Sequence, residues 1–562
     1  MTDLDTLIEG FLTNEFETSP VLASSLGLTE YDERLDDLSA DAFKKRDADA
    51  VEWLARFEAV PDDGLSADAR IDRDLAIAML RGRVIVADWQ GWKRDPLVYS
   101  GPALSGIFGL FLHRIRPESE LVDAAIARLE QIPRALEQGA ANLDADLASE
   151  LIVGRGLASA RAGGRYVRDL VPMEAPEGPQ RDRLRAAGEK AGAGFDAWIT
   201  FLEAFKSRAH GEWRFGEERY TRLLRERESL TYDARTLRAR GEAEYDRLDA
   251  EMRALAFRAR GTEDWRSVLD EANRDHAPTE EGMRAAYADW TERARTFLAE
   301  TGLVTLPNGE SCIVEPSPVF QRPVIGVASY NGSPAFTDLL LGHFFVPFAP
   351  DGTPPEEVQK RLEANSYDGI PTVAVHETYP GHHWHITWSK IHASHIRLVL
   401  GTPYFSEGWA LYAEQVMRER GFFTDPVQEL YHLEATLFRA ARIIVDTSLH
   451  IGDMDFEQGV TFMTTKTPLP EPTARAEVGR YCWWPTQASA YLTGCLEILR
   501  IRDRFLASKG QAGIEPAKVD VAILREFHDR LAATGRLPLG LAERALMDVE
   551  PGATAGGAPP AG

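Results

Sequence analysis

The chain has 562 residues, of which 44% are apolar and 27% charged, and its formal net charge is −25. This composition is typical of a soluble globular protein, and the length allows two or three domains or one large helical body. The negative charge argues against binding to nucleic acid or to an anionic membrane surface, because both carry negative charge themselves.

The cysteines and the N-terminal segment indicate where the protein works. Cys312, Cys482 and Cys495 form no C-x-x-C pair, and an odd number gives no disulfide framework. The first twenty residues carry acids where a signal peptide needs basic and then apolar residues, and no apolar run approaches the roughly 20 residues that span a bilayer. We therefore expect a cytoplasmic protein, either a monomer or a homodimer.

The hydrophobic pattern predicts a mainly α fold with one small sheet. Apolar residues at three- and four-residue spacing predict long helices from Leu121 to about Glu300. Strand signals with Asn-Gly turns lie between Leu303 and Val346, and helical patterning continues from Pro355 to about Met547. The predicted division is an N-terminal helical half (1–300), a β-sheet region (301–348), a second helical half (349–548) and a disordered tail (549–562).

A cluster of histidines opens the second helical half, in VAVHETYPGHHWHITW. His376 and Glu377 supply the first half of the zinc motif H-E-x-x-H, which places two histidines on one helix face with a glutamate beside the metal-bound water. In a regular helix, however, His382 would point about 240° away from His376, and His383 would lie about 10 Å along the axis. Pro380-Gly381 can break the helix, so a bulge or kink could return a second histidine to the metal. The alternative is a set of surface or core histidines without a metal.

A third ligand is expected from the segment YFSEGWALYAEQVM, which has helical periodicity. Glu407 follows His382 by 25 residues, enough for a helix to end, a loop to form and a second helix to pack against the first. Glu414 is at i+7 from Glu407, on the same helix face, and could orient a ligand histidine from the second shell. The alternative for both acids is a solvated helix face.

HETYPGHH followed by SEGWALYAE resembles the signature of the domain-of-unknown-function 885 family of bacterial proteins. That family is related to the gluzincin oligopeptidases, which include thimet oligopeptidase, angiotensin-converting enzyme and carboxypeptidase Taq and carry the motif H-E-x-G-H. Gly381-His382 corresponds to the Gly-His step, which favours His382 over His383 as a ligand and leaves His383 to the second shell. Ser448 and Thr486 depart from the family pattern, in which glycine is usual.

The resemblance extends over nearly the whole chain and implies a large helical zincin-like peptidase fold, with a small β-sheet lining a deep central channel. It implies one zinc ion bound by His376, His382 and Glu407. Glu377 would then be the general base that takes a proton from water and returns it to the leaving amine. The related oligopeptidases stabilise the oxyanion with a tyrosine or histidine from C-terminal helices; Tyr491 is the first choice here and Tyr481 the second, although either could be a packed aromatic.

Four polar residues, Arg439, Arg442, Asp446 and His450, follow one stripe of a predicted helix. Arginine suits a bidentate grip on a peptide carboxylate, so Arg442 and His450, with Tyr481, are predicted to bind substrate. The competing interpretation, equally weighted, is an internal Arg–Asp network that fixes the helix, and Arg480 has the same two interpretations.

These inferences predict a zinc-dependent metallopeptidase that acts on short peptides. One alternative is a zinc amidase or related hydrolase acting on a non-peptide amide. The other is a non-catalytic helical peptide-binding protein, which would have no use for Glu377 as a base. The segment HFFVPF (343–348) is expected to bind the substrate backbone as an added edge strand.

Overall fold

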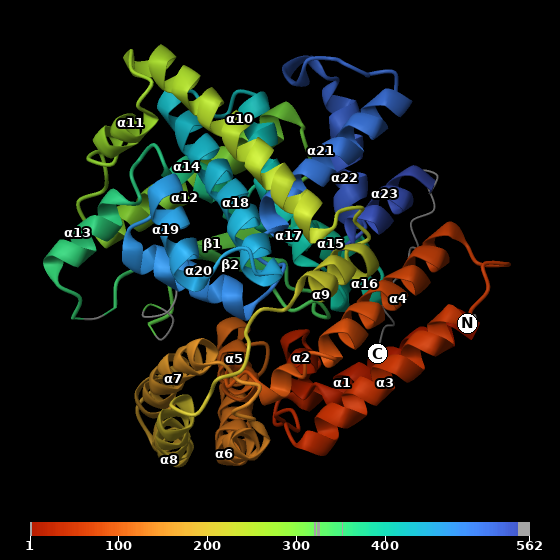
Figure 1. Cartoon of the computed structure of the whole chain (residues 1–562), viewed down its shortest axis with the longest axis vertical. Coiled ribbons are helices and arrows are strands. Elements are labelled where there is room, and N and C mark those ends of the chain that lie inside the picture. The colour runs from red at the N-terminus through yellow and green to blue at the C-terminus, as the bar shows by residue number, and fades with distance from the viewer. Residues whose placement is uncertain (1–2, 320–321, 323–325, 351, 549–562) are drawn as a thin grey trace.

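The fold is mainly helical with one small three-stranded sheet, as the hydrophobic pattern predicts (Figure 1). The computed structural model describes residues 3–319, 322, 326–350 and 352–548. The predicted disordered tail (549–562) lies outside these residues. None of the described helices is long and apolar enough to cross a membrane.

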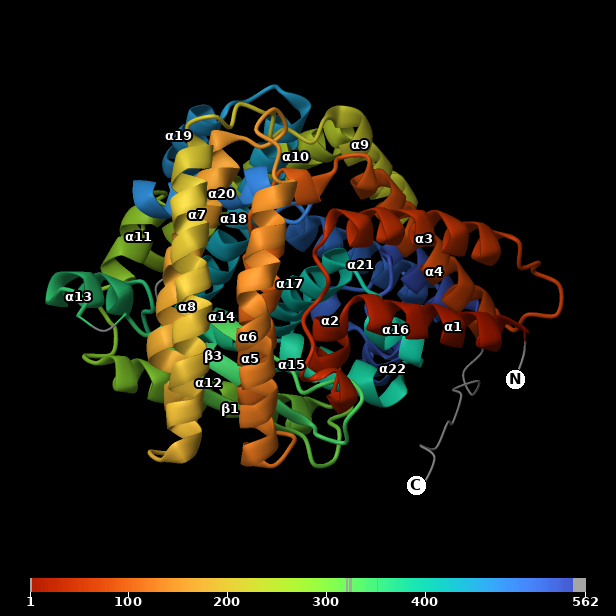
Figure 2. The same ribbon diagram turned by 90° about the horizontal axis from the view of Figure 1, so that it is seen from below.

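The N-terminal helices form two groups that pack differently. The first group is α1 (Asp3–Thr18), α2 (Pro20–Ser25), α3 (Ala40–Glu58) and α4 (Ala67–Ala87). The second group is α5 (Leu97–His113), α6 (Glu118–Asn142), α7 (Glu150–Arg165) and α8 (Pro179–Lys206). The helices of the second group lie side by side in Figure 2 and enclose a hydrophobic core of their own. Helices α1, α3 and α4 contribute to the larger core instead.

The middle of the chain connects these groups to the second helical half. Its helices are α9 (Glu217–Arg222), α10 (Ala234–Arg260), α11 (Trp265–Ala272) and α12 (Glu280–Thr301). The long helix α10 packs against α18 (Pro426–Ile451). Gly241 makes this approach possible, because a Cβ atom there would lie 2.7 Å from Cγ2 of Ile443.

The sheet consists of β1 (Ser311–Pro316), β2 (Ser329–Asn331) and β3 (Leu341–Val346) in the order β1-β3-β2. β1 runs parallel to β3, and β2 runs antiparallel to it. The expectation that HFFVPF (343–348) offers a free edge to substrate is therefore wrong. β3 is the central strand, and its two sides are already paired with β1 and β2.

The remaining helices build the second helical half. They are α13 (Pro355–Glu363), α14 (Ile370–Glu377), α15 (His382–His392), α16 (His395–Val399), α17 (Pro403–Glu419), α18, α19 (Phe456–Lys466), α20 (Glu471–Trp483), α21 (Ala490–Ser508), α22 (Val521–Ala533) and α23 (Leu539–Asp548). α17 and α21 touch backbone to backbone, because a Cβ on Gly408 would lie 2.5 Å from Gly494.

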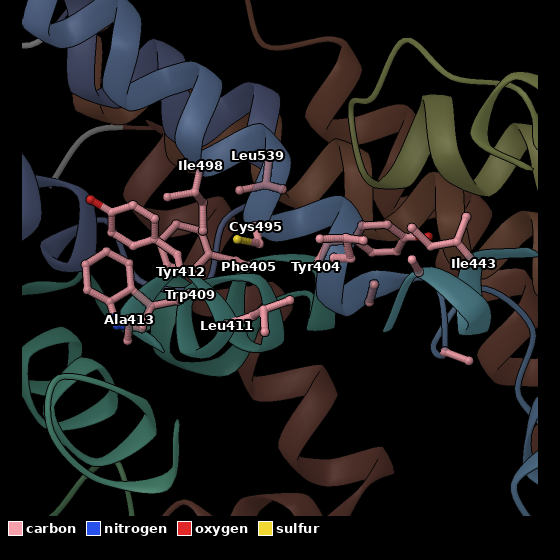
Figure 3. Close-up of a cluster of buried hydrophobic side chains, with 14 of the residues drawn as sticks. Tyr404, Phe405, Trp409, Leu411, Tyr412, Ala413, Ile443, Cys495, Ile498 and Leu539 are labelled. Atoms are coloured by element: carbon pink, nitrogen blue, oxygen red, sulfur yellow. The ribbon is translucent and has the colours of Figure 1, made fainter. Parts of the chain in front are cut away.

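An aromatic core fixes α17 in this position. Phe405, Trp409 and Tyr412 of α17 gather with Cys495 and Ile498 of α21 in Figure 3, and all five side chains are buried. Burying large apolar side chains of this kind contributes roughly 1.5–3 kcal/mol each. The same helix carries both acids that the sequence analysis singles out, so their positions are set by a rigid, well-packed element.

Candidate metal centre

The histidine motif folds into two helices rather than one bulged helix. α14 ends at Glu377 and α15 begins at His382, with Thr378–Gly381 between them. Gly381 is required at this corner, because a Cβ there would lie 1.9 Å from the carbonyl oxygen of His376. The Trp409 indole of α17 donates a 2.8 Å hydrogen bond to the carbonyl of Pro380, which ties the corner to the next helix.

The helix break brings together the three side chains that the sequence analysis proposes as ligands. One ligand atom each from His376, His382 and Glu407 lies within 4.8 Å of the others. Nε2 of His382 is 3.4 Å and Nε2 of His376 3.8 Å from Oε2 of Glu407. Across the described part of the chain, no other histidine, cysteine and carboxylate side chains meet in this way.

The three donors fit a zinc ion in both chemistry and spacing. Two imidazole nitrogens and a carboxylate oxygen are the ligand set of many hydrolytic zinc sites, which leave the fourth position open. Two ligand atoms bonded at about 2.1 Å in a tetrahedral arrangement lie about 3.4 Å apart. The Nε2–Oε2 separations of 3.4 and 3.8 Å for His382 and His376 are close to that value.

Glu414 holds the imidazole of His376 through Nδ1, the ring nitrogen that does not face the other ligands. Its Oε1 lies 2.7 Å from Nδ1 of His376, and its Oε2 lies 3.1 Å from Nδ1 of His432. Burial alone would raise the pKa of Glu414, but its hydrogen bonds with these two histidines outweigh burial and lower the pKa to about 2. When the Nδ1–H of His376 donates to this carboxylate, Nε2 carries no proton, and its lone pair faces the other ligands.

His432 is a member of this centre that the sequence analysis missed. Its Nε2 lies 3.2 Å from Oε1 of Gln415, so Glu414 and Gln415 together hold the ring. A signal was present, because His432 is seven residues before Arg439 and therefore continues the polar stripe of α18 toward its N-terminus.

His383 points away from the ligands. Its Nε2 lies 2.8 Å from Oε2 of Glu310, and its Nδ1 lies 2.9 Å from the Tyr330 hydroxyl. Glu310 also accepts hydrogen bonds from Arg295 and Tyr379. The structure therefore does not bring His383 to His376, His382 or Glu407. It anchors the first turn of α15 to the segment before β1 instead.

Glu377 is the acid next to the cluster, and no described residue is its hydrogen-bond or ion-pair partner. Its carboxylate makes no hydrogen bond or ion pair with another described residue, and the residue is 8% exposed. Burial raises its pKa, although the neighbouring His376 and His382 oppose this effect. A carboxylate that is available and more basic than usual suits proton transfer.

Of the predicted substrate-binding residues, Arg442 and Tyr481 bind to each other through an internal network. Arg442 donates to Glu477 at 2.9 Å, and the Tyr481 hydroxyl donates to the same carboxylate at 2.7 Å. Arg480 also donates to Glu477, at 3.0 Å. These contacts favour the internal-network interpretation for Arg442, with Glu477 of α20 rather than Asp446 as the acid.

His450 is likewise held by the protein itself. Its Nδ1 accepts a 3.1 Å hydrogen bond from the Phe215 N–H, and its Nε2 lies 3.0 Å from the Tyr481 carbonyl. Asp446, one turn earlier, accepts from the Tyr220 hydroxyl at 2.6 Å. Burial lowers the pKa of His450 to about 4. Both ring nitrogens are thus used to fasten α18 to its neighbours.

Tyr491, the first choice for an oxyanion donor, packs against the arginines of α18. Its hydroxyl accepts a 3.3 Å hydrogen bond from the Gln487 side chain, and the Arg442 guanidinium carbon is 4.7 Å from its ring centroid. Burial and then the charge of Glu407 raise its pKa, so the phenol stays protonated and able to donate.

Comparison with known proteins places the chain among bacterial proteins of the same fold. A family model described as “Bacterial protein of unknown function (DUF885)” matches residues 20–546. A solved “putative lipoprotein of unknown function” from Shewanella oneidensis has 19% identity and a TM-score of 0.77, with 97% of this chain and 99% of that chain covered. A “putative lipoprotein” from Colwellia psychrerythraea has 20% identity and a TM-score of 0.81, with the same coverage. No curated protein matches the sequence.

Proposed function

We propose that this chain, which belongs to the DUF885 family of bacterial proteins, is a zinc-dependent metallopeptidase that hydrolyses short peptides. The single observation that carries the proposal is the convergence of His376, His382 and Glu407 beside Glu377, which has no partner among the described residues. Two imidazoles, one carboxylate and an adjacent free acid form the minimal set for hydrolysis by an activated water.

The surroundings of the cluster support a catalytic rather than a structural metal. Structural zinc sites are closed by four protein ligands, whereas three donors converge here. The side chains of His382 and Glu407 are 13% and 21% exposed, so solvent reaches them. We infer that the helical body is zincin-like and that a channel gives a peptide access to this point.

The protein's own groups can then carry out the proton transfers. A zinc ion held by the three ligands would supply Lewis acidity toward a peptide carbonyl and a water molecule. Glu377 takes a proton from the water and returns it to the leaving nitrogen, for which its raised pKa is suitable. The Tyr491 hydroxyl can donate a hydrogen bond to the developing oxyanion. Glu414 keeps His376 in the tautomer that presents Nε2.

The test combines metal content with turnover. The purified protein is expected to hold about one zinc per chain and to cleave a pool of short peptides, with products identified by mass spectrometry. Glu377→Gln should keep the zinc and lose at least about 100-fold in turnover, because it removes only the base. Peptide cleavage that persists in Glu377→Gln, or zinc binding that survives His382→Ala together with Glu407→Ala, would overturn the proposal. Turnover of small acyl amides but of no peptide would favour an amidase.

A further inference from the structure

One arginine beside the candidate metal centre forms no ion pair with any residue that the structure describes. α18 presents Arg439 and Arg442 one turn apart, and Arg442 is bound to Glu477 at 2.9 Å. Within the described residues Arg439 has no ion pair, and its one hydrogen bond runs from Nη1 to the Ala435 carbonyl at 3.0 Å. Its Nε is buried without an acceptor. A guanidinium has five N–H donors, so most of the binding capacity of Arg439 is unused.

This arginine lies next to the proposed catalytic residues. Its guanidinium carbon is 5.8 Å from the ring centroid of Tyr491. Burial raises the pKa of Glu377, and Arg439 is among the positive groups that lower it. Arg439 also acts in this way on Glu414. The free guanidinium is thus within electrostatic reach of both the general base and the acid behind His376.

Three guanidinium groups lie near Tyr491, and two of them share one acid. Arg442 and Arg480 both pair with Glu477, at 2.9 and 3.0 Å. Arg439 has no such pair among the described residues, although its charge acts to lower the pKa values of Glu377, Glu414 and Glu434. A guanidinium without an ion pair can bind an anionic group of a ligand.

We propose that Arg439, backed by Arg442 and Arg480, binds the α-carboxylate at the C-terminus of the substrate, so that the enzyme removes residues from the C-terminal end of peptides. This inference rests on the proposed peptidase function. A guanidinium can grip a carboxylate with two parallel hydrogen bonds, and Arg439 uses only one of its N–H groups in a described hydrogen bond. The backbone of an internal stretch of peptide carries no negative charge.

The cut should fall near the C-terminal end of the peptide. Tyr491 contacts both arginines, and the charge of Glu407 raises the pKa of its phenol, so the same tyrosine is near both the carboxylate site and a proposed ligand. Hydrolysis adds the hydroxyl of water to the acyl carbon and a proton to the leaving nitrogen. The products are a shortened peptide and the fragment cut from its C-terminal end.

The first experiment needs no variant. The zinc-loaded protein is given the same set of short peptides in three forms: with both ends free, with an amidated C-terminus, and with an acetylated N-terminus. The free and acetylated peptides should be cleaved with similar kcat/KM, and the amides about 10- to 100-fold less efficiently, as for the loss of a charge-assisted contact. Equal cleavage of acids and amides, or products cut from the middle of the peptides, would overturn the carboxylate site and leave the peptidase function standing.

The second experiment assigns the effect to Arg439. Arg439→Gln should raise KM for free-acid peptides about 10- to 100-fold, change kcat less, and abolish the preference for acids over amides. Arg439→Lys should recover part of the preference, because the charge stays while the bidentate geometry is lost. Arg253→Gln is the matched control, since Arg253 is an exposed arginine paired with Asp249 on α10. A uniform loss for acids and amides in Arg439→Gln would mean that this arginine only supports the fold.

Calorimetry separates failure of this inference from failure of the proposed function. Glu377→Gln protein is titrated with one short peptide as its free acid and as its amide. The acid should bind about 10- to 100-fold more tightly, and the difference should disappear when Arg439→Gln is added. If the wild type cleaves no peptide but this difference is present, the peptidase function is wrong and the carboxylate site stands. If acid and amide bind equally, the carboxylate site is wrong whatever the turnover.

Discussion

Nδ1 of His376 lies 2.7 Å from Oε1 of Glu414, and both side chains are buried. The contact joins a residue at the end of α14 to one in the middle of α17, 38 positions later. It fixes which nitrogen of the imidazole faces His382 and Glu407. A carboxylate–histidine pair of this kind also makes the ring a better metal ligand.

Replacing Glu414 should therefore weaken metal binding without removing a ligand. Glu414→Gln keeps an oxygen that can accept the Nδ1–H but loses the negative charge, and the zinc affinity should fall about 10- to 100-fold. Competition with a chromophoric chelator measures the change. Glu457→Gln is the control, because Glu457 is an exposed acid of α19 that pairs with Arg475 at 2.7 Å. Equal zinc affinity in Glu414→Gln and the wild type would rule out this supporting role.

The corner between α14 and α15 should tolerate no side chain. A Cβ on Gly381 would lie 1.9 Å from the His376 carbonyl oxygen and 2.3 Å from that of Val375, both rigid backbone atoms. Gly381→Ala must shift the start of α15, and with it His382. We expect a loss of several kcal/mol in the free energy of unfolding, on the order of 3 kcal/mol, and loss of bound zinc.

Gly479→Ala provides the comparison for this substitution. Gly479 lies inside α20, and the nearest atom to a Cβ there is 4.0 Å away on Phe456. Alanine should be neutral or stabilise that helix by up to about 1 kcal/mol. Chemical denaturation of both variants and their zinc content decide the matter. A Gly381→Ala protein that is as stable as the wild type and keeps its zinc would contradict the corner geometry.

The acid sensitivity of the fold should depend in part on His528. Its Nδ1 lies 2.8 Å from the Leu303 carbonyl, and its Nε2 lies 2.7 Å from the Tyr412 hydroxyl. Burial lowers its pKa from 6.5 to about 4. Below pH 6.5 the unfolded chain binds a proton that the folded chain does not, so stability falls as the pH falls from 6.5 to about 4. The loss from this one group amounts to about 3 kcal/mol.

His528→Gln isolates that contribution. The variant should be less stable at pH 8 but should lose about 3 kcal/mol less than the wild type between pH 7 and pH 4. Unfolding by urea is followed at each pH with a chelator present, so that metal binding does not contribute. The buried His385 and His450, whose pKa values are also lowered, remain in both proteins and cancel in the comparison. Parallel pH curves for the two proteins would show that His528 does not titrate as proposed.

The sequence predicts the parts of this centre that depend on residue type and local spacing. Helical periodicity gives the mainly α fold, and Pro380-Gly381 explains how His382 can return to His376 after six positions. A glutamate on a later helix completes the group. The sequence reveals these features because only a few residue types bind a metal ion or break a helix.

What the sequence does not reveal is the choice of partners far apart in the chain. Arg439 and Arg442 lie on one stripe of a helix, and the sequence does not distinguish them. In the structure Arg442 pairs with Glu477, 35 residues later, whereas Arg439 forms no ion pair with a described residue. In the same way, Glu310 takes His383 out of the cluster from 73 residues away. The central place of β3 depends on pairing with two other segments, which no local pattern specifies.

Thr486 is a position where the backbone conformation has a cost. Its φ angle is +71°, in the left-handed region, and its side chain is buried. A β-branched residue is strained there by about 1–2 kcal/mol, while glycine is not. Thr486→Gly should therefore stabilise the fold by about 0.5–1 kcal/mol after the extra flexibility of the unfolded chain is subtracted. Thr465→Gly, inside α19, should instead destabilise it by about 0.5 kcal/mol. Urea midpoints measure both, and a Thr486→Gly protein less stable than the wild type would show that the packing of the threonine outweighs its backbone strain.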